Sequence, residues 1–463
     1  MNRASNKKIE TGSKILIIGG GPAGCFFALY LLHYGRERGI KPEITIYEQR
    51  NFDAMGPKGC KGCAGVLSIS LLRNLGEIGL SIPEEIVQNR IERYTVHTPY
   101  TSITISNPEK AIQVASIYRG GGPRKSDYES PISFNGWLLR EAQKHGVRVE
   151  NQRVSRINLE RQAVVAVGGN ELRCDLVVLA SGVNTKPIPI TGVDYVPPET
   201  QIMSLDELYV GTQQVESRIG NVAHAFLIPH SGLVFGTLVP KGPFISVSLL
   251  SKGEHPISVT DFLRHDLVRT VLPERCKHVC GCRPQAIVGP AQNYFADGFV
   301  AIGEAAMSRL YKDGIGSSLL TAREAARTVV YHGISRQDFK HRYQLFCRSI
   351  ERDNGWGRLL FSINDKGKES YAFSCAQQRL IGGEHTSTGR PKPFTRAAWG
   401  MFTGSYSYRS IAQMTFSPAS MAKLIVALSW ESLRGLPYKG VANRKILYVG
   451  GRKKRTKQGH GNR

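Results

Sequence analysis

The sequence predicts an α/β fold in which a parallel sheet is interrupted by an antiparallel sheet and followed by a helical C-terminal extension. A short apolar strand, a glycine-rich turn and a helix lie near the N-terminus. Alternating apolar runs separated by Pro- and Gly-rich turns occupy residues 191–295. A parallel-type strand and a long helix return after residue 296, and the remaining sequence is mostly helical in pattern and basic. Together these observations predict an α/β domain with an insertion.

The first element is a βαβ unit with a glycine-rich turn. Lys14–Ile18 predicts a buried parallel strand, and Ala23–His33 predicts the helix that follows it. Between them, Gly19–Gly24 fits the pattern G-x-G-x-x-G. Glycine is needed there because the backbone turns tightly and lets a pyrophosphate approach the helix N-terminus. The next strand, Glu43–Tyr47, is followed by Glu48, whose carboxylate is placed to accept hydrogen bonds from ribose hydroxyls.

The remaining elements follow from periodicity and from the positions of glycine and proline. A glycine-rich loop at Gly56–Gly65 leads into an apolar helix near Leu67–Leu75. Strands are predicted at Ile91–His97, Thr101–Ile105, Gln113–Tyr118, Asp175–Ala180, Ala225–Ile228, Leu233–Val239, Ile245–Leu250 and Phe299–Ile302, and helices at Phe134–His145 and Gly314–Val330.

This order of elements predicts five segments. Residues 13–190 form the first part of a Rossmann-like dinucleotide-binding domain, and residues 296–335 return to it as a closing strand and helix. Residues 191–295 form the inserted antiparallel sheet domain, which we expect to bind the substrate. Residues 336–440 form the helical C-terminal region, and residues 441–463 form a basic tail.

Composition limits the partners. With 41% hydrophobic and 21% charged residues, the 463-residue chain is typical of soluble globular proteins. We find no secretory signal and no apolar run of the about 18 residues that spans a bilayer. A cytoplasmic location is therefore expected, and contact with a membrane surface stays open.

The net charge of +24 is concentrated near the C-terminus, where ten Lys or Arg and no Asp or Glu follow Glu431. A solvated tail explains this charge, as does attraction to anionic lipid or to an acidic partner. No sequence signature of a nucleic-acid-binding fold accompanies it, so nucleic acid is not expected as a partner.

The nine cysteines leave three interpretations open. Cys60-x-x-Cys63 has the spacing of half a thiolate metal site, and Cys280 and Cys282, with Cys276 nearby, are candidates for the other half. The alternatives are a redox disulfide between Cys60 and Cys63, and structural thiols without redox or metal chemistry. We expect structural thiols and no resident metal.

Two strand ends carry a family resemblance. The segments are Cys174-Asp-Leu-Val-Val-Leu-Ala-Ser-Gly and Phe299-Val-Ala-Ile-Gly-Glu-Ala-Ala. With the glycine turn, they resemble the three fingerprints of the FAD-dependent hydroxylase fold, which aromatic hydroxylases, flavin halogenases and geranylgeranyl reductases share. The resemblance covers about residues 13–335. Gly303-Glu304 departs from the usual Gly-Asp, so the ribityl contact that the resemblance implies would shift with the longer side chain of Glu304.

Two further stretches narrow the resemblance to the geranylgeranyl reductases. Cys63-Ala-Gly-Val-Leu-Ser resembles their cysteine-glycine loop over the flavin. Arg309-Leu-Tyr-Lys-Asp-Gly-Ile-Gly, followed by Thr321-Ala-Arg-Glu-Ala-Ala, resembles their loop and helix after the Gly-Asp motif. Phe226-Leu-Ile-Pro-His and Val239-Pro-Lys loosely resemble the segment that lines their lipid pocket.

The resemblance implies FAD as cofactor, with NAD(P)H or a ferredoxin as the electron donor. It implies Cys63 and Gly65 as residues at the catalytic face of the flavin. The cofactor-binding residues that the motifs and the resemblance together predict are Gly19, Gly21, Pro22, Ala23, Gly24, Glu48, Ala64, Gly182, Gly303, Glu304, Gly314, Ile315 and Gly316.

Three functions are compatible with these features. The first is reduction of carbon–carbon double bonds in a hydrophobic, isoprenoid-type substrate. The second is a monooxygenase of the hydroxylase or halogenase type acting on an aromatic or polyketide-like substrate, since Ala64-Gly-Val-Leu also resembles the hydroxylase loop. Halogenation is disfavoured because His224-Ala-Phe-Leu-Ile-Pro lacks both tryptophans of the halogenase element. The third is a non-enzymatic scaffold that binds prenylated partners, which the intact glycine turn and Glu48 disfavour.

The last predicted helix, within Phe416–Leu436, begins at Ser417-Pro418 and carries apolar residues along much of its length. Packing against the catalytic unit explains this pattern. An interfacial helix that brings the protein to an anionic membrane surface explains it as well, and the adjacent basic tail favours that alternative.

Overall fold

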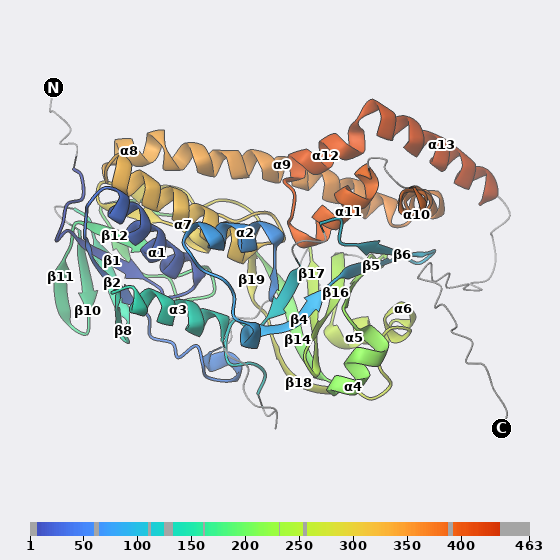
Figure 1. The fold of residues 1–463 in the computed structure, drawn as a ribbon, viewed down its shortest axis with the longest axis horizontal. Helices are drawn as coiled ribbons and strands as arrows, with labels where there is room; N and C mark the ends of the chain where they lie inside the picture. Colours follow the sequence, from blue (N-terminus) through green and yellow to red (C-terminus); the bar gives the residue numbers. More distant parts are fainter. Residues whose placement is uncertain are drawn as a thin grey trace, which may run out of the picture.

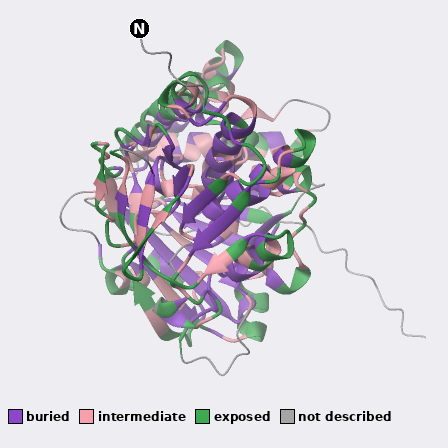
Figure 2. Cartoon of the chain, turned by 90° about the vertical axis from the view of Figure 1, so that its left-hand side faces the viewer, coloured by how far each residue is buried: buried purple, intermediate pink, exposed green. Residues whose placement is uncertain are grey.

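Two sheets lie side by side, and helices from the C-terminal region run across both (Figure 1). The computed structural model describes residues 7–59, 64–109, 113–124, 133–160, 163–230, 232–252, 257–387 and 392–435. Buried residues gather in the strands, and exposed ones lie on the outer helices and turns (Figure 2).

The first sheet is the parallel one that the glycine turn predicted. Its order is β20 (Phe295–Ala296), β21 (Phe299–Ala301), β12 (Leu176–Leu179), β1 (Lys14–Ile18), β2 (Glu43–Tyr47) and β8 (Arg148–Glu150). All neighbours are parallel except the β20–β21 hairpin. The packed helices are α1 (Pro22–Glu37), α3 (Phe134–Lys144), α7 (Gly314–Tyr331) and α8 (Arg336–His341).

A smaller sheet shares the core of this lobe. It consists of β11 (Asn170–Arg173), β10 (Val164–Val167), β9 (Val154–Asn158) and β13 (Ile190–Thr191). Ile15 and Val177 of the parallel sheet, Phe26 of α1 and Val165 of β10 all belong to one buried apolar cluster. Because both faces of β1 are covered, its residues after Lys14 are apolar without alternation.

The second sheet is mostly antiparallel. Its order is β18 (Lys277–Cys282), β14 (Thr200–Tyr209), β17 (Phe244–Ser251), β16 (Leu233–Lys241), β15 (Val222–Phe226), β5 (Arg93–His97) and β6 (Ser102–Ser106), with β19 (Gln285–Ile287) paired to β14. Its small helices are α4 (Thr212–Gln214), α5 (Val259–Arg264) and α6 (Asp266–Arg269).

The second sheet is not confined to residues 191–295, which corrects the predicted boundary. Strands β5 and β6 come from the segment assigned to the dinucleotide-binding domain, and β5 pairs in parallel with β15. A third sheet consists of β3 (Val66–Leu67), β7 (Val114–Ile117) and β4 (Val87–Ile91). In the chain, β3, α2 (Ile69–Glu77) and β4 precede β5 and β6, and β7 follows them. The chain therefore crosses to the second lobe twice.

The C-terminal helices connect the two lobes. They are α9 (Tyr343–Gly367), α10 (Tyr371–Thr386), α11 (Pro393–Thr403), α12 (Tyr408–Phe416) and α13 (Pro418–Arg434). At the start of α9, the Tyr343 hydroxyl donates to the carbonyl of Ala301 in the parallel sheet. Just past its end, Lys368 Nζ donates to the carbonyl of Leu233 in the second sheet. One helix, roughly 37 Å long at 1.5 Å per residue, thus joins both sheets.

A buried histidine pair lies in the second sheet. His97 Nε2 and His224 Nδ1 are 2.9 Å apart, and His97 also contacts the Ser102 hydroxyl at 2.8 Å. Burial lowers the pKa of His97 to about 4, and burial together with His97 and Arg93 lowers the pKa of His224 to about 3. Both rings are therefore neutral in the folded protein at neutral pH.

The histidine pair predicts acid sensitivity. Because the folded pKa values lie below the ordinary value of 6.5, the pair's contribution to stability is complete above pH 6.5 and falls as the pH drops toward 4 and then 3. We expect the melting temperature to fall between pH 6.5 and 4, and the double variant His97→Phe, His224→Leu to show a smaller fall. Thermal denaturation followed by circular dichroism measures this, with His33→Gln on α1 as the control. An equally steep pH dependence in the double variant would contradict the prediction.

Candidate functional site

The glycine turn is locked by close backbone contacts. Gly19 has φ +109°, and a β-carbon there would lie 2.6 Å from the carbonyl oxygen of Ala180. A β-carbon at Gly24 would lie 2.0 Å from the carbonyl oxygen of Gly19. At Gly21, by contrast, a β-carbon would meet nothing within 4 Å. The outer glycines are therefore required by packing, whereas Gly21 leaves open space at the start of α1.

Glu48 is held against this turn. Its carboxylate accepts hydrogen bonds from the backbone N–H of Gly20 and of Arg50, each at 2.9 Å. These two bonds fix the end of β2 to the glycine turn. Glu48 lines the same open space as Gly21.

A cavity of about 380 Å³ opens here, and we call it the glycine-turn cavity. Seven of the predicted cofactor residues line it: Gly19, Gly21, Pro22, Ala23, Glu48, Gly182 and Glu304. Two lining residues that the sequence did not indicate carry buried polar atoms without a hydrogen-bond partner. These are both side-chain polar atoms of Asn135, which is 1% exposed, and Nε of Arg119.

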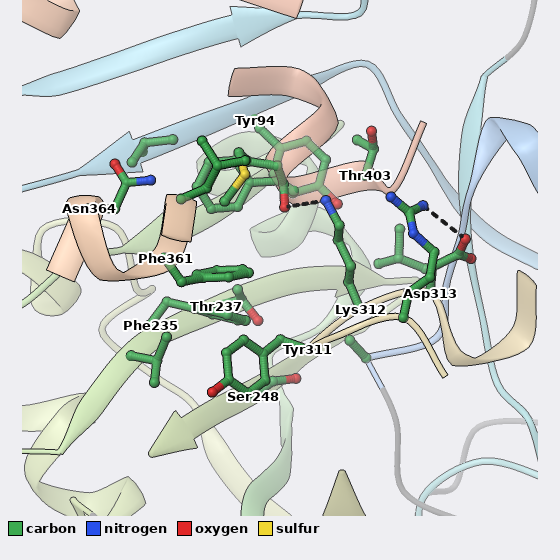
Figure 3. Close-up of a pocket in the computed structure, with 18 of the residues that line it drawn as sticks. Tyr94, Phe235, Thr237, Ser248, Tyr311, Lys312, Asp313, Phe361, Asn364 and Thr403 are labelled. Atoms are coloured by element: carbon green, nitrogen blue, oxygen red, sulfur yellow. Dashed lines mark hydrogen bonds and ion pairs between the residues drawn. The ribbon is translucent and has the colours of Figure 1, made fainter. Parts of the chain in front are cut away.

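A second cavity of about 360 Å³, here called the apolar cavity, adjoins the first. Ala64, Gly65, Gly314 and Ile315 line it, and Arg119, Asn184 and Glu304 line both cavities. Its walls come from β5, β6, β14, β16, β17 and β19 on one side and from α9 to α13 on the other. Figure 3 shows Phe235, Phe361 and Tyr94 facing this space, with Lys312 and Asp313 at one end and Asn364 at the other.

The cavities meet at the carboxylate of Glu304. A β-carbon at Gly314 would lie 2.7 Å from Glu304 Oε1, and one at Gly182 would lie 3.9 Å from its Oε2. Glu304 therefore lies between the end of β12 and the start of α7.

Three predicted cofactor residues line neither cavity. Gly24 packs on the turn itself, and a β-carbon at Gly303 would lie 2.6 Å from that of Ala23. Gly316 donates its N–H to Asp313 Oδ1 at 3.2 Å, which caps α7. Close packing around the glycine turn explains the glycines at 24 and 303, whereas a β-carbon at Gly316 would lie 2.3 Å from the capping oxygen Asp313 Oδ1.

Part of the predicted cysteine chemistry lies outside the described residues. Cys60 and Cys63 are there, so neither the catalytic role of Cys63 nor the CxxC half-site has a described geometry. Cys280 and Cys282 lie on β18 at the edge of the second sheet, and Cys282 is exposed. Within the described ranges, no cluster of three or more His, Cys, Asp or Glu side chains is arranged to hold a metal ion.

The loop that leads into α7 is anchored by two partly buried cations. Arg309 donates to the carbonyls of Gly404 and Tyr406, at 2.7 and 2.6 Å. Lys312 Nζ donates to the carbonyl of Gly400 at 2.6 Å and lies 4.1 Å from the centre of the Tyr408 ring.

Burial, with Arg309 beside it, holds the pKa of Lys312 well below its ordinary value. Burial likewise raises the pKa of Asp313, although the guanidinium of Arg309 lies 3.6 Å from that carboxylate and opposes the rise. These groups fix the backbone between Glu304 and α7.

Two hydroxyls interrupt the apolar wall. Thr237 on β16 and Ser248 on β17 are directly opposite each other in the antiparallel register, so their side chains share one face. Both line the apolar cavity (Figure 3), and both hydroxyl oxygens are buried without a hydrogen-bond partner. Neither residue was indicated by the sequence, where each is one polar position in an alternating strand.

Comparison with known proteins identifies the fold. The model of the family described as FAD dependent oxidoreductase matches residues 110–328, which is less than half of the chain. The chain has the fold of the FAD-dependent oxidoreductases. No curated protein matches it in sequence.

Three solved structures illustrate the range of this fold. A flavoprotein/dehydrogenase from Cytophaga hutchinsonii has 14% identity and a TM-score of 0.60, with 91% of this chain and 100% of that chain covered. A geranylgeranyl bacteriochlorophyll reductase-like protein from Thermoplasma acidophilum has 14% identity and a TM-score of 0.55, with 90% and 100% covered. p-Nitrophenol 4-monooxygenase from Pseudomonas putida has 13% identity and a TM-score of 0.53, with 90% and 99% covered. A flavin-dependent halogenase and a second halogenase also match.

The residues that line the glycine-turn cavity fit an FAD. The open space at Gly21 suits a pyrophosphate at the start of α1, where the N-cap provides no side-chain hydrogen bond. The unpartnered polar atoms of Asn135 and Arg119 are placed to bond a ligand in the same cavity. Glu48 would hold the ribose end, and Glu304 the chain that leads to the ring.

A side chain introduced at Gly21 tests FAD binding in a protein that still folds. Gly21 has φ −70° and ψ −175°, an extended conformation that valine adopts readily, so we expect Gly21→Val to fold. Its side chain would occupy the pyrophosphate path and weaken FAD binding at least about tenfold. FAD titration of the apoprotein by fluorescence quenching measures this. The control is Gly355→Val on α9, where a β-carbon also meets nothing. A Gly21→Val protein that retains the flavin content of the wild type would refute this assignment.

Proposed function

We propose that this protein is an FAD-dependent oxidoreductase that reduces carbon–carbon double bonds in a hydrophobic, isoprenoid-type substrate. The observation that carries the proposal is the direct junction of the glycine-turn cavity with a cavity whose walls are largely aliphatic and aromatic. A substrate that fills such a space is itself mostly apolar, because most of the wall surface is apolar. The geranylgeranyl reductase-like protein of the same fold supports this choice.

The chain's own residues provide binding and exclusion of water. Phe235, Phe361 and Leu227 surround the substrate space, and the anchored loop at Lys312 closes one end of it. When bound, FAD supplies a hydride equivalent, which is two electrons and one proton. Saturating one double bond takes that hydride and one further proton. An external donor, NAD(P)H or reduced ferredoxin molecules, must then return two electrons, together with one proton from the donor or from water, for the next turnover.

A monooxygenase is the second candidate. It is favoured by the match to p-nitrophenol 4-monooxygenase and by Ala64–Leu67, whose sequence also resembles the hydroxylase loop. The two functions differ in the electron acceptor, which is the alkene in one and oxygen in the other.

Reoxidation kinetics distinguish them. We expect photoreduced enzyme, mixed without oxygen in a stopped-flow cell, to regain its yellow absorbance with geranylgeraniol and to stay bleached with the saturated alcohol phytanol. Both alcohols fill the same space, so only the double bonds differ. If the enzyme stays bleached with both and reoxidises only when oxygen is admitted, faster with p-nitrophenol present, the monooxygenase replaces the reductase.

We further propose that Thr237 and Ser248 bind a hydroxyl or carbonyl oxygen of the substrate. Buried hydroxyls in native proteins are almost always hydrogen-bonded, so an unpartnered pair that faces a cavity is typical of a ligand contact. The substrate would then be an apolar molecule with one polar group lying against β16 and β17.

Ligand binding tests this contact without turnover. We expect Thr237→Val and Ser248→Ala each to weaken binding of farnesol by about two- to tenfold, while binding of the hydrocarbon farnesene is unchanged. Perturbation of the flavin absorbance during titration reports both affinities. Ser251→Ala is the matched control, because Ser251 is also buried and unpartnered on β17 but lines neither cavity. Equal losses for farnesol and farnesene would show that the hydroxyls support packing only.

A further inference from the structure

Helix α13 presents an apolar surface that no described part of the chain covers. Val426 and Leu433 are each 69% exposed, and Ile425 and Trp430 are 57% and 48% exposed. At 100° per residue these four side chains fall on one side of the helix. Fully buried positions on α13 are few, namely Ser420, Ala427 and Glu431.

The exposed charges around this surface are positive. The acidic residue of α13, Glu431, is buried and bonded to Arg379, with Nε–Oε1 and Nη2–Oε1 distances of 2.7 and 2.6 Å. The exposed charged residues of α13 are Lys423 and Arg434. The guanidinium groups of Arg379 and Arg434 lie 5.6 and 4.9 Å from the centre of the Trp430 ring. An apolar face bordered by cations and followed by nine further Lys or Arg after Arg434 complements an anionic, apolar partner.

The opposite side of the same helix reaches the apolar cavity. Leu424 of α13 lines that cavity, together with Thr415 and Phe416 from the end of α12. No single helix in the described ranges is long and apolar enough to cross a membrane. Among the helices of the described residues, α12 and α13 satisfy that test when taken together, and they are bent by 64° at Ser417. A bent pair with one exposed apolar side suits a position along a membrane surface.

We propose that α13 docks on the surface of an anionic lipid bilayer, with Ile425, Val426, Trp430 and Leu433 inserted among the lipids. A second copy of this chain is the poorer occupant, because two such surfaces would bring cations together. The wall formed by Leu424 and Phe416 would then lie beside the bilayer, where an isoprenoid substrate dissolves. That last consequence rests on the proposed function, whereas docking itself does not.

Vesicle flotation with the full-length holoprotein tests docking without turnover. We expect the wild type to float with phosphatidylcholine vesicles containing 30% phosphatidylglycerol, and less with pure phosphatidylcholine. The double variant Val426→Glu, Leu433→Glu should bind the anionic vesicles at least about tenfold more weakly, because both side chains leave the lipid. Leu345→Glu on α9, where the leucine is 53% exposed, is the matched control and should bind like the wild type.

Two other outcomes overturn the docking proposal. A double variant that floats like the wild type would assign binding to the basic tail alone. No flotation of the wild type, with a dimer in light scattering that the double variant abolishes, would assign the surface to a second copy. Flavin content and melting temperature of both variants show that they fold. A wild type that binds vesicles but fails the geranylgeraniol test would leave docking standing and reject the reductase.

Discussion

The geometry of the site depends on two partly buried cations in one loop. Arg309 and Lys312 lie between the turn at Glu304 and the helix α7, and their side chains bond to backbone carbonyls at the end of α11 and just beyond it. A buried cation is costly unless its N–H groups are bonded. Separation of the C-terminal helices from the loop would remove these hydrogen bonds from both cations, so the helices and the loop hold each other in place.

This constraint makes the C-terminal region part of the site. Helix α9 bonds to the parallel sheet through Tyr343, and Lys368 just beyond its end bonds to the second sheet, while Asn354 within it bonds to both Ser308 and Leu310 of the loop. The same helices supply one wall of the apolar cavity, and the second sheet supplies the other. A change of volume in α11 would therefore affect both the substrate space and the backbone that leads into α7.

The sequence predicted what depends on neighbours along the chain. The strand Lys14–Ile18, the turn at Gly21 and the start of α13 at Ser417-Pro418 follow from local patterns, and the structure confirms these elements. The pairing of β5 with β15 joins residues about 130 positions apart, and no local pattern specifies it. Asn135 and Thr237 were missed for the same reason, since a polar residue in an apolar element gains meaning only when its surroundings are known.

Helix α13 exposes apolar side chains of the kind that most helices bury. Most helices in proteins are stable because an apolar face is buried, yet this one buries fully only a serine, an alanine and a glutamate. The Ser417 cap and the Arg379–Glu431 pair hold it in position without that burial. Its side chains Ile425, Val426, Trp430 and Leu433 are left exposed. Exposed apolar area of this kind is unfavourable in water. The position of this apolar surface beside the cavity wall at Leu424 is therefore best explained by an apolar partner.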